Sequence, residues 1–252
     1  MSKLTGHRAV ITGGGTGIGL ACARSLAEQG AHVILMGRDL ARLKEAAATI
    51  GDAEAIQLDV TDPASVETAF AQAARGGMID ILVNNAGVVG AMPFHRTPME
   101  EWQRIQSVNV EGLVRCTQAV IGPMLKAGYA RIVNIASIAG LRGGAYISPY
   151  VASKHAVVGL TKSLSLEYAH TSITANAVCP GYVETAIVEN SAANIMAKTG
   201  RTREEALAEL TKTNPQGRLI QADEVAEAVT WLCSPLSGSI SGQAITISGG
   251  AI

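Results

Sequence analysis

The chain has 252 residues, of which 48% are hydrophobic and 16% charged, and its formal net charge is -1. This length suits one α/β domain, and the lack of basic runs argues against a nucleic-acid partner. The four cysteines are scattered without a CxxC pair, as is typical of free thiols in a reducing compartment. With neither a signal-peptide pattern nor an apolar run of about 18 residues, we expect a cytoplasmic protein that does not associate with membranes.

Short apolar runs of strand-forming residues alternate with helical patterns along the whole chain. This alternation predicts a Rossmann-like, doubly wound α/β domain over residues 1–252, with a seven-stranded parallel sheet and helices on both faces. The predicted strands cover residues 8–12, 32–36, 55–60, 80–85, 131–137, 173–179 and 243–248.

A glycine-rich turn follows the first predicted strand, with glycines at Gly13, Gly17 and Gly19 in a GxxxGxG spacing. Such a turn lets the backbone approach a pyrophosphate, and the N-terminus of the next helix favours negative charge. Glycine turns also serve tight packing alone, but a strand before and a helix after favour a phosphate-binding site.

The second predicted strand ends at Gly37-Arg38, where folds of this class contact the adenosine ribose. A carboxylate at this position suits NAD(H), whereas an arginine can pair with a 2′-phosphate. Arg38 therefore favours NADP(H) over NAD(H). The alternative is a solvated arginine beside Asp39, which would cap the next helix.

Three later segments have helix-start signals. Asp62 is followed by a proline that suits the first helical position. Thr97 with Glu100, and Thr202 with Glu205, have the spacing of capping boxes.

Tyr150 and Lys154 lie four residues apart in SPYVASKHA. If Ser148 caps a helix that Pro149 opens, the two side chains share one face, and the ammonium should lower the pKa of the phenol toward the working pH. Taken alone, the pair is more typical of packing with a solvated lysine side chain. Ser137, at the carboxyl end of the fifth predicted strand, strengthens the catalytic interpretation because ligands bind at that edge.

The segment 182–220 is longer than one crossover connection requires and contains two helical patterns, at 187–200 and 202–214. An insertion beside the carboxyl edge of a sheet is typical of a substrate lid.

In their order along the chain, these motifs resemble the short-chain dehydrogenase/reductase family. The residues that carry the resemblance are TGGGTGIG (12–19), Asp59, NNAG (84–87), Asn109, Ser137, Tyr150, Lys154 and PGYVET (180–185). The resemblance covers nearly the whole chain and implies a metal-independent hydride transfer between a nicotinamide cofactor and a carbonyl carbon.

The resemblance also implies residue roles. Tyr150 would be the general acid in reduction and the base in oxidation, Lys154 would hold the nicotinamide ribose, and Ser137 would polarise the carbonyl. Asn109 would hold a water of a proton relay. The implied cofactor-binding set is Gly13, Thr16, Gly17, Ile18, Gly19, Arg38, Asp59, Val60, Asn85, Ala86, Gly87, Tyr150, Lys154, Pro180, Gly181, Val183 and Thr185.

The candidate substrate pocket is apolar and contains Val89, Leu141, Tyr146 and Ile187. The chain is similar to 3-oxoacyl-thioester and polyketide ketoreductases and to 3-hydroxybutyrate dehydrogenases. The dehydrogenases hold a carboxylate with polar side chains at positions that here are Val89, Ala139 and Ile147, which favours a 3-oxoacyl thioester or another hydrophobic ketone.

Two alternatives stay open. One is a secondary-alcohol or hydroxy-acid dehydrogenase working oxidatively. The other is a nucleotide-sensing regulator without turnover. The family resemblance further implies a homotetramer, with contacts through residues 98–126, 149–169 and the C-terminal strand region.

Overall fold

Seven parallel strands form the central sheet, in the spatial order β3-β2-β1-β4-β5-β6-β7. The computed structural model describes residues 3–212 and 214–252, and within them not the side chain of Ile187. The strands are β1 (Arg8–Thr12), β2 (His32–Gly37), β3 (Ala53–Gln57), β4 (Ile81–Asn84), β5 (Ala130–Ile135), β6 (Ile173–Pro180) and β7 (Ala244–Ile247). The predicted doubly wound sheet is confirmed.

The strand order reverses between β1 and β4. The chain runs outward from β1 to β2 and β3, then returns to place β4 on the other side of β1. The loops after β1 and β4 therefore leave the carboxyl edge of the sheet in opposite directions. In open α/β sheets, the crevice at this reversal is where ligands bind.

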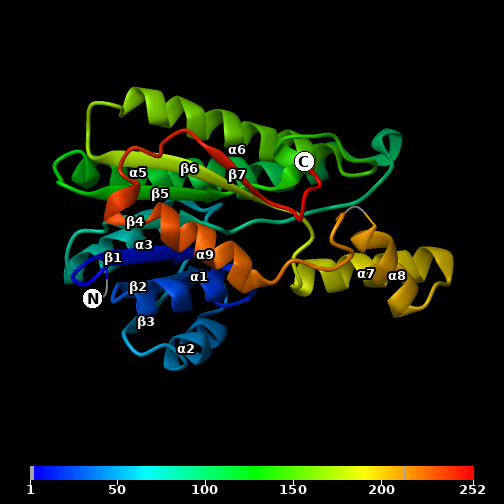
Figure 1. Cartoon of the computed structure of the whole chain (residues 1–252), viewed down its shortest axis with the longest axis horizontal. Coiled ribbons are helices and arrows are strands. Elements are labelled where there is room, and N and C mark those ends of the chain that lie inside the picture. The colour runs from blue at the N-terminus through cyan, green and yellow to red at the C-terminus, as the bar shows by residue number, and fades with distance from the viewer. Residues whose placement is uncertain (1–2, 213) are drawn as a thin grey trace.

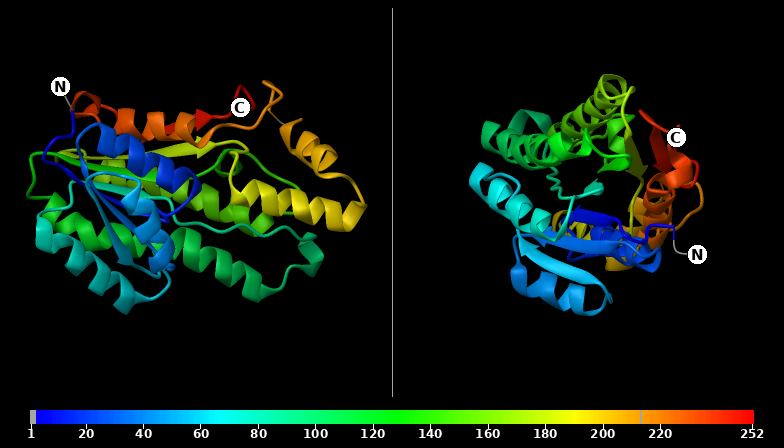
Figure 2. Two further views of the ribbon diagram at one scale, coloured as in Figure 1. Left: turned by 90° about the horizontal axis from the view of Figure 1, so that it is seen from below. Right: turned by 90° about the vertical axis from the view of Figure 1, so that its left-hand side faces the viewer.

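Helices cover both faces of the sheet (Figures 1 and 2). Side chains alternate along each strand, so that Ile11 packs in the core on one face and Val10 in the core on the other. The first face is covered by α1 (Gly17–Glu28), α2 (Leu40–Ala48) and α9 (Ala222–Leu232). The second is covered by α3 (Pro63–Ala73), α5 (Gly112–Met124) and α6 (Ser148–Glu167), with α4 (Met99–Gln106) preceding α5.

The third strand differs from its predicted position. It spans Ala53–Gln57 rather than residues 55–60, because it is an edge strand that pairs only with β2, whose last paired residue is Gly37. Beyond that point the chain turns: the Asp59 carboxylate accepts hydrogen bonds from the backbone N–H and the hydroxyl of Thr61. The buried Leu58 and Val60 explain the longer apolar pattern in the sequence.

Two helix starts are confirmed. The Asp62 carboxylate accepts a hydrogen bond from the Ala64 N–H, with Pro63 in the first turn. Thr202 and Glu205 form the expected reciprocal capping box at the start of α8 (Arg203–Thr211).

Two other helix starts were predicted wrongly. The Thr97 hydroxyl donates to the Pro93 carbonyl, and α4 begins at Met99 without a side-chain cap. Ser148 is the first residue of α6 rather than its cap, which is Ile147. The shift of one residue keeps Tyr150 and Lys154 one turn apart.

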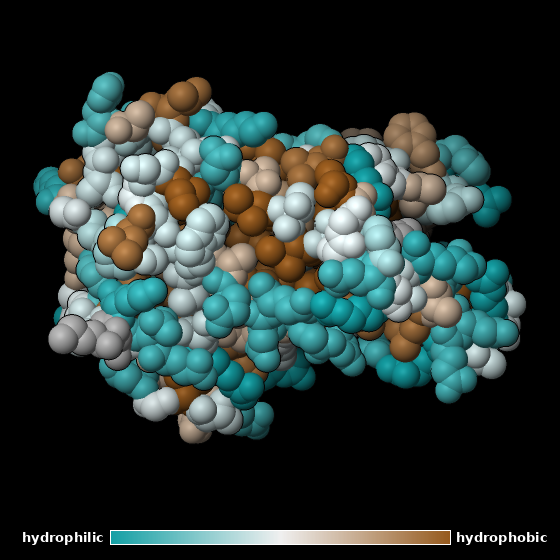
Figure 3. Space-filling view, viewed as in Figure 1, coloured by the Kyte–Doolittle hydropathy of each residue, from teal (hydrophilic) through white to brown (hydrophobic). Residues whose placement is uncertain are grey.

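The inserted segment forms a helical hairpin of α7 (Ala186–Thr199) and α8 (Arg203–Thr211). It has its own apolar cluster, made by Val188, Ala192, Ala206 and Leu210. Figure 1 shows the hairpin extending from one end of the molecule, apart from the helices that cover the sheet. In Figure 3, viewed as Figure 1, a notch at the right-hand side separates the α7–α8 hairpin from the part of the molecule above the hairpin. Across the described residues, no helix is both long and apolar enough to cross a membrane.

Candidate active site

The glycine turn packs directly against the loop after β4. Gly13 and Gly17 adopt positive φ values of 66° and 51°, which favour glycine. Gly19 needs no unusual backbone, but an added Cβ would lie 2.3 Å from the Gly13 carbonyl oxygen. The Asn85 amide donates to the carbonyls of Thr12 and Gly13 at 2.9 and 3.2 Å. The two loops of the crevice are thus joined into one surface.

The N-terminus of α1 opens onto this surface. Its N-cap Thr16 makes no side-chain capping bond, and its first turn, with Ile18, contains no acidic residue. Across the turn, the methyl carbon of Thr185 would lie 3.1 Å from a Cβ on Gly17. Backbone N–H groups, a helix dipole and the small glycine surface together fit a dinucleotide pyrophosphate.

Two arginines follow β2: Arg38 directly after the strand and Arg42 in the first turn of α2. Arg38 is exposed, and its positive charge contributes to a lowered pKa of Asp59. Asp39 caps α2 by accepting the Arg42 N–H at 3.1 Å. The Cγ of Arg42 would lie 3.6 Å from a Cβ on Gly15 in the glycine turn. Sequence reasoning missed Arg42 because its distance from the turn depends on how α2 packs.

Asp59 and Val60 lie in the turn after β3, close to the crevice. The pKa of Asp59 is lowered chiefly because its carboxylate accepts hydrogen bonds from Thr61. Val60 is buried, and its carbonyl accepts a hydrogen bond from Arg115 at 3.3 Å. Their contact with adenine stays a prediction.

Ser137, Tyr150 and Lys154 meet at the carboxyl edge of β5. The Ser137 side chain lies close enough to the Tyr150 phenol to lower its pKa, and its hydroxyl accepts the Ala139 N–H at 3.1 Å. Lys154 is only 5% exposed, and its Nζ donates to the Ile135 carbonyl at 2.8 Å. That Nζ lies 5.7 Å from the centre of the Tyr150 ring. A hydroxyl, a phenol and an ammonium thus converge at one point of the crevice.

Burial moves the two ionisable groups in opposite directions. It raises the pKa of the Tyr150 phenol, and the nearby Ser137 hydroxyl offsets only part of this effect. It lowers the pKa of Lys154 to about 8. The predicted lowering of the Tyr150 pKa by Lys154 is therefore wrong for this arrangement, because desolvation of the phenol outweighs an ammonium that points toward the Ile135 carbonyl.

Asn109 lies in a π-helical turn (Ser107–Glu111) between α4 and α5. Such turns are frequent at functional sites. Its amide oxygen accepts the Val88 N–H at 2.8 Å, and its Nδ2 donates to the Val88 carbonyl at 2.9 Å and to the Ser153 hydroxyl at 3.0 Å. Ser153 in turn donates to the Tyr150 carbonyl at 2.7 Å. Asn109 thus ties the loop after β4 to α6, while its water-relay role stays a prediction.

Ser153 is fully buried and was not singled out from the sequence. The available signal was a serine immediately before Lys154, on the same helix as Tyr150. Only the fold shows that its hydroxyl faces Asn109, 44 positions earlier.

The segment after β6 passes over the glycine turn. Gly181 donates its N–H to the Ile247 carbonyl at 2.9 Å, directly after Pro180, which ends β6. Val183 is buried and pairs with Ile220 in an isolated bridge, which closes the base of the α7–α8 hairpin. This path brings Thr185 to Gly17. Segment 180–185 therefore borders the crevice, while its contact with the nicotinamide end of the cofactor stays a prediction.

The predicted pocket residues lie on separate loops. Tyr146 is the only described non-glycine residue with a positive φ, 67°, and its carbonyl accepts the Met92 N–H at 2.7 Å. Its side chain is 65% exposed, whereas Leu141 packs against an apolar cluster under α6. Val89 is half-buried. Ile187 lies on α7, but its side chain is outside the described residues.

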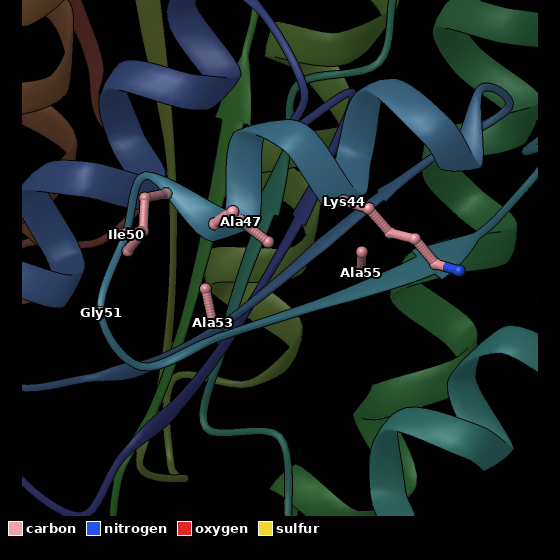
Figure 4. Close-up of a pocket in the computed structure, with 7 residues that line it drawn as sticks. Lys44, Ala47, Ile50, Gly51, Ala53 and Ala55 are labelled. Atoms are coloured by element: carbon pink, nitrogen blue, oxygen red, sulfur yellow. The ribbon is translucent and has the colours of Figure 1, made fainter.

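A shallow recess of about 440 Å³ lies elsewhere, between α2 and β3 (Figure 4). Small apolar residues line most of it, and Lys44 is its one charged group. It contains none of the crevice residues, so we assign no chemistry to it. Among the described side chains, no cluster of His, Cys, Asp and Glu is arranged to hold a metal ion.

A family model described as short chain dehydrogenase matches residues 7–196. The chain belongs to this family. As a short-chain dehydrogenase, it is an oxidoreductase that interconverts a ketone and a secondary alcohol with NAD(P)(H).

Relatives match over almost their full lengths. A protein of Streptomyces virginiae named as a ketoacyl reductase of the monensin polyketide synthase is 42% identical over 259 residues, covering 99% of this chain and 98% of that protein. The D-beta-hydroxybutyrate dehydrogenase of Rhizobium meliloti is 37% identical over 250 residues, covering 96% of this chain and 97% of that protein. A crystal structure of an actinorhodin polyketide ketoreductase variant with NADPH superimposes with a TM-score of 0.95 at 37% identity, covering 100% of this chain and 99% of that chain.

Proposed function

We propose that this short-chain dehydrogenase reduces a 3-oxoacyl thioester, or a similar hydrophobic ketone, with NADPH. The observation that carries the proposal is the convergence of Ser137, Tyr150 and Lys154 at the carboxyl edge of the sheet. The similarity to polyketide ketoreductases points to the substrate class.

Each of the three residues has a distinct task. Tyr150 gives a proton to the carbonyl oxygen of the substrate, while Ser137 hydrogen-bonds that oxygen and fixes its position. Because burial raises the pKa of the Tyr150 phenol, the group is protonated at neutral pH, as an acid in reduction must be. Lys154 would hold the nicotinamide ribose and keep a positive charge beneath the site.

The cofactor, when bound, supplies the hydride. Gly13, Thr16, Gly17, Ile18 and Gly19 would hold its pyrophosphate. Asp59 and Val60 would contact the adenine, the loop Asn85, Ala86 and Gly87 the adjacent ribose, and Pro180, Gly181, Val183 and Thr185 the nicotinamide end.

NADPH is favoured over NADH by the charges at the end of β2. Arg38 follows β2 directly, Arg42 lies beside the glycine turn, and the carboxylate of Asp39 is engaged as the cap of α2. A 2′-phosphate would meet two guanidinium groups there. An NAD-binding site instead needs a carboxylate free to accept from the ribose hydroxyls.

The candidate substrate pocket is poorly suited to bind the carboxylate of a small free acid. Val89, Ala139 and Ile147 supply apolar side chains where a carboxylate-binding pocket would need polar ones, and Ala139 is buried. Placing a carboxylate against such groups without donors is costly. Together with Leu141, Tyr146 and Ile187, these positions favour an apolar acyl substrate covered by the α7–α8 hairpin as a lid.

The proposal also includes assembly as a homotetramer and a reducing, cytoplasmic location. The outer face of α6 exposes Ala152, Ala156 and Gly159, which allow a second helix to approach closely. The edge strand β7 is half-buried along its length, and brown apolar atoms gather over the middle of that face in Figure 3. The described cysteines are all buried free thiols. Sedimentation velocity tests the assembly.

The deciding experiment is a panel of 3-oxoacyl thioesters, cyclic ketones, 3-hydroxybutyrate and secondary alcohols, each assayed with both cofactors. We expect the highest kcat/KM for an apolar 3-oxoacyl thioester with NADPH. Turnover confined to 3-hydroxybutyrate with NAD⁺ would favour the oxidative alternative. Dinucleotide binding without turnover of any substrate would favour a nucleotide-sensing regulator.

A further inference from the structure

Residues 88–92, the substrate loop, lie in the irregular connection between β4 and α4, beside the catalytic residues. A Cβ on Gly87, immediately before the loop, would lie 3.7 Å from the Nζ of Lys154. At the far end, the Met92 N–H donates to the carbonyl of Tyr146, whose φ is positive. The loop forms neither helix nor strand, so its conformation must be determined by contacts with other segments.

One helical segment contacts three consecutive residues of this loop. Asn109 binds both backbone groups of Val88. One turn earlier on that segment, the Nη2 of Arg104 donates to the Val89 carbonyl at 3.2 Å. The next residue, Gly90, lies against the carboxylate of Glu101.

Glu101 orients the arginine. Its two carboxylate oxygens accept from the Nε and Nη2 of Arg104 at 2.7 and 2.8 Å, which fixes the guanidinium plane. The same Nη2 has a second hydrogen, and this is the one that reaches the Val89 carbonyl.

Gly90 is required here for space rather than for its backbone conformation. It is not among the glycines with a positive φ. A Cβ at this position, however, would lie 1.9 Å from the Oε1 of Glu101. Any larger residue must displace the carboxylate and, with it, the guanidinium that Glu101 orients.

We propose that Arg104 is a positioning residue of this enzyme: oriented by Glu101, it holds the Val89 carbonyl and thereby fixes the substrate loop against the catalytic residues. The inference rests on the proposed function for the statement that this loop borders the substrate. The clamp itself rests on the contacts alone. Arg104 is 44% exposed, so its ion pair adds little to global stability, and its effect belongs to the loop.

The test compares Arg104→Ala, Gly90→Ala, Glu101→Ala and the double variant Gly90→Ala/Glu101→Ala with the wild type. Gln103→Ala, an exposed position on the same helix, is the matched control. The readouts are KM and kcat for the ketone, the Kd of NADPH, and hydrogen exchange of the amides in residues 86–92.

We expect Arg104→Ala to raise the KM of the ketone roughly five- to tenfold, with a smaller change in kcat and an unchanged Kd of NADPH. The amides of the substrate loop should exchange roughly tenfold faster. Gly90→Ala should raise KM similarly in the wild type but add nothing in the Glu101→Ala background, where the carboxylate that blocks the new Cβ is gone.

Two results would overturn the inference. One is exchange in the substrate loop that is the same in Arg104→Ala and Gln103→Ala. The other is an undiminished effect of Gly90→Ala when Glu101 is already alanine. If the wild type turned over no ketone, the proposed function would fail, while the exchange measurement would still decide the clamp.

Discussion

Lys154 donates its hydrogen bond to the Ile135 carbonyl at 2.8 Å, so its ammonium is anchored to β5 rather than to the phenol of Tyr150. The ammonium nevertheless lies 5.7 Å from the Tyr150 ring centre. The helix α6 thus sets the spacing of Tyr150 and Lys154, while β5 determines where the ammonium of Lys154 lies.

Burial of this charge should make the stability of the fold depend on pH. Burial lowers the pKa of Lys154 from 10.5 to about 8. Below pH 8 both states carry the proton, and the folded state bears the full cost of burying it. Between about pH 8 and 10.5 only the unfolded state keeps the proton, so stability rises with pH by at most about 3 kcal/mol.

Urea denaturation of the wild type and of Lys154→Met checks this sign. We expect the stability of the wild type relative to the variant to increase from pH 7 to pH 10. A stability difference that stayed constant over that range would mean that the lysine titrates at its ordinary pKa.

Tyr150→Phe should remove most turnover and leave cofactor binding intact. The substitution deletes only the hydroxyl, the group that lies beside Ser137 and would protonate the substrate. Loss of a general acid lowers kcat by about 10²- to 10⁴-fold. Steady-state kinetics measure the loss, and fluorescence titration measures the Kd of NADPH. Turnover equal to the wild type would refute the proposed mechanism.

The sequence predicts the parts of this molecule that depend on local patterns. Apolar runs locate all seven strands, because parallel strands buried on both faces are hydrophobic throughout. The bounds of the edge strand β3 are predicted less well than its presence, since they depend on where β2 stops pairing. Likewise, the four-residue spacing of Tyr150 and Lys154 holds although Ser148 lies inside the helix instead of capping it.

Contacts between distant segments could not be predicted in this way. Arg42 reaches the glycine turn, and Ser153 reaches Asn109, only because two helices pack as they do. The raised pKa of Tyr150 has the same origin. Spacing indicates which charge is near, whereas desolvation depends on everything that covers the phenol.

Asn109→Ala should loosen the connection between the loop after β4 and α6. The change leaves the backbone groups of Val88 without their side-chain partner, and Ser153 without a donor. We expect a loss of about 2 kcal/mol, and a Tm lower by about 4–8 °C for a chain of this size. Thermal denaturation beside the exposed Gln118→Ala tests this, and equal Tm values for the two variants would contradict it.

The preference for NADPH should depend on both Arg38, directly after β2, and Arg42, in the first turn of α2. Arg38→Ala and Arg42→Ala should each raise the KM of NADPH about tenfold, because each removes one charge near the 2′-phosphate. The KM of NADH should change little. If only Arg38→Ala had an effect, Arg42 would be a surface residue beside Gly15 and nothing more.

Gly19→Ala should disrupt the dinucleotide site without any backbone strain at the substituted residue. The new Cβ would lie 2.3 Å from the Gly13 carbonyl oxygen and 2.6 Å from the Nδ2 of Asn85. The carbonyl is backbone and cannot rotate away, so the glycine turn itself must shift, at a cost of about 1–3 kcal/mol in stability. We expect the Kd of NADPH to rise by at least about tenfold, since the turn and the N-terminus of α1 would no longer match a pyrophosphate.

Gly128→Ala is the matched control for Gly19→Ala. Nothing lies within 4 Å of a Cβ at Gly128, and its φ is not positive. Alanine there should be neutral or stabilise by up to about 1 kcal/mol through the unfolded chain. Isothermal titration of both variants with NADPH then isolates the effect of the turn. If Gly19→Ala bound NADPH as tightly as Gly128→Ala, the turn after β1 would be a packing feature, and the dinucleotide would have to bind elsewhere along the crevice.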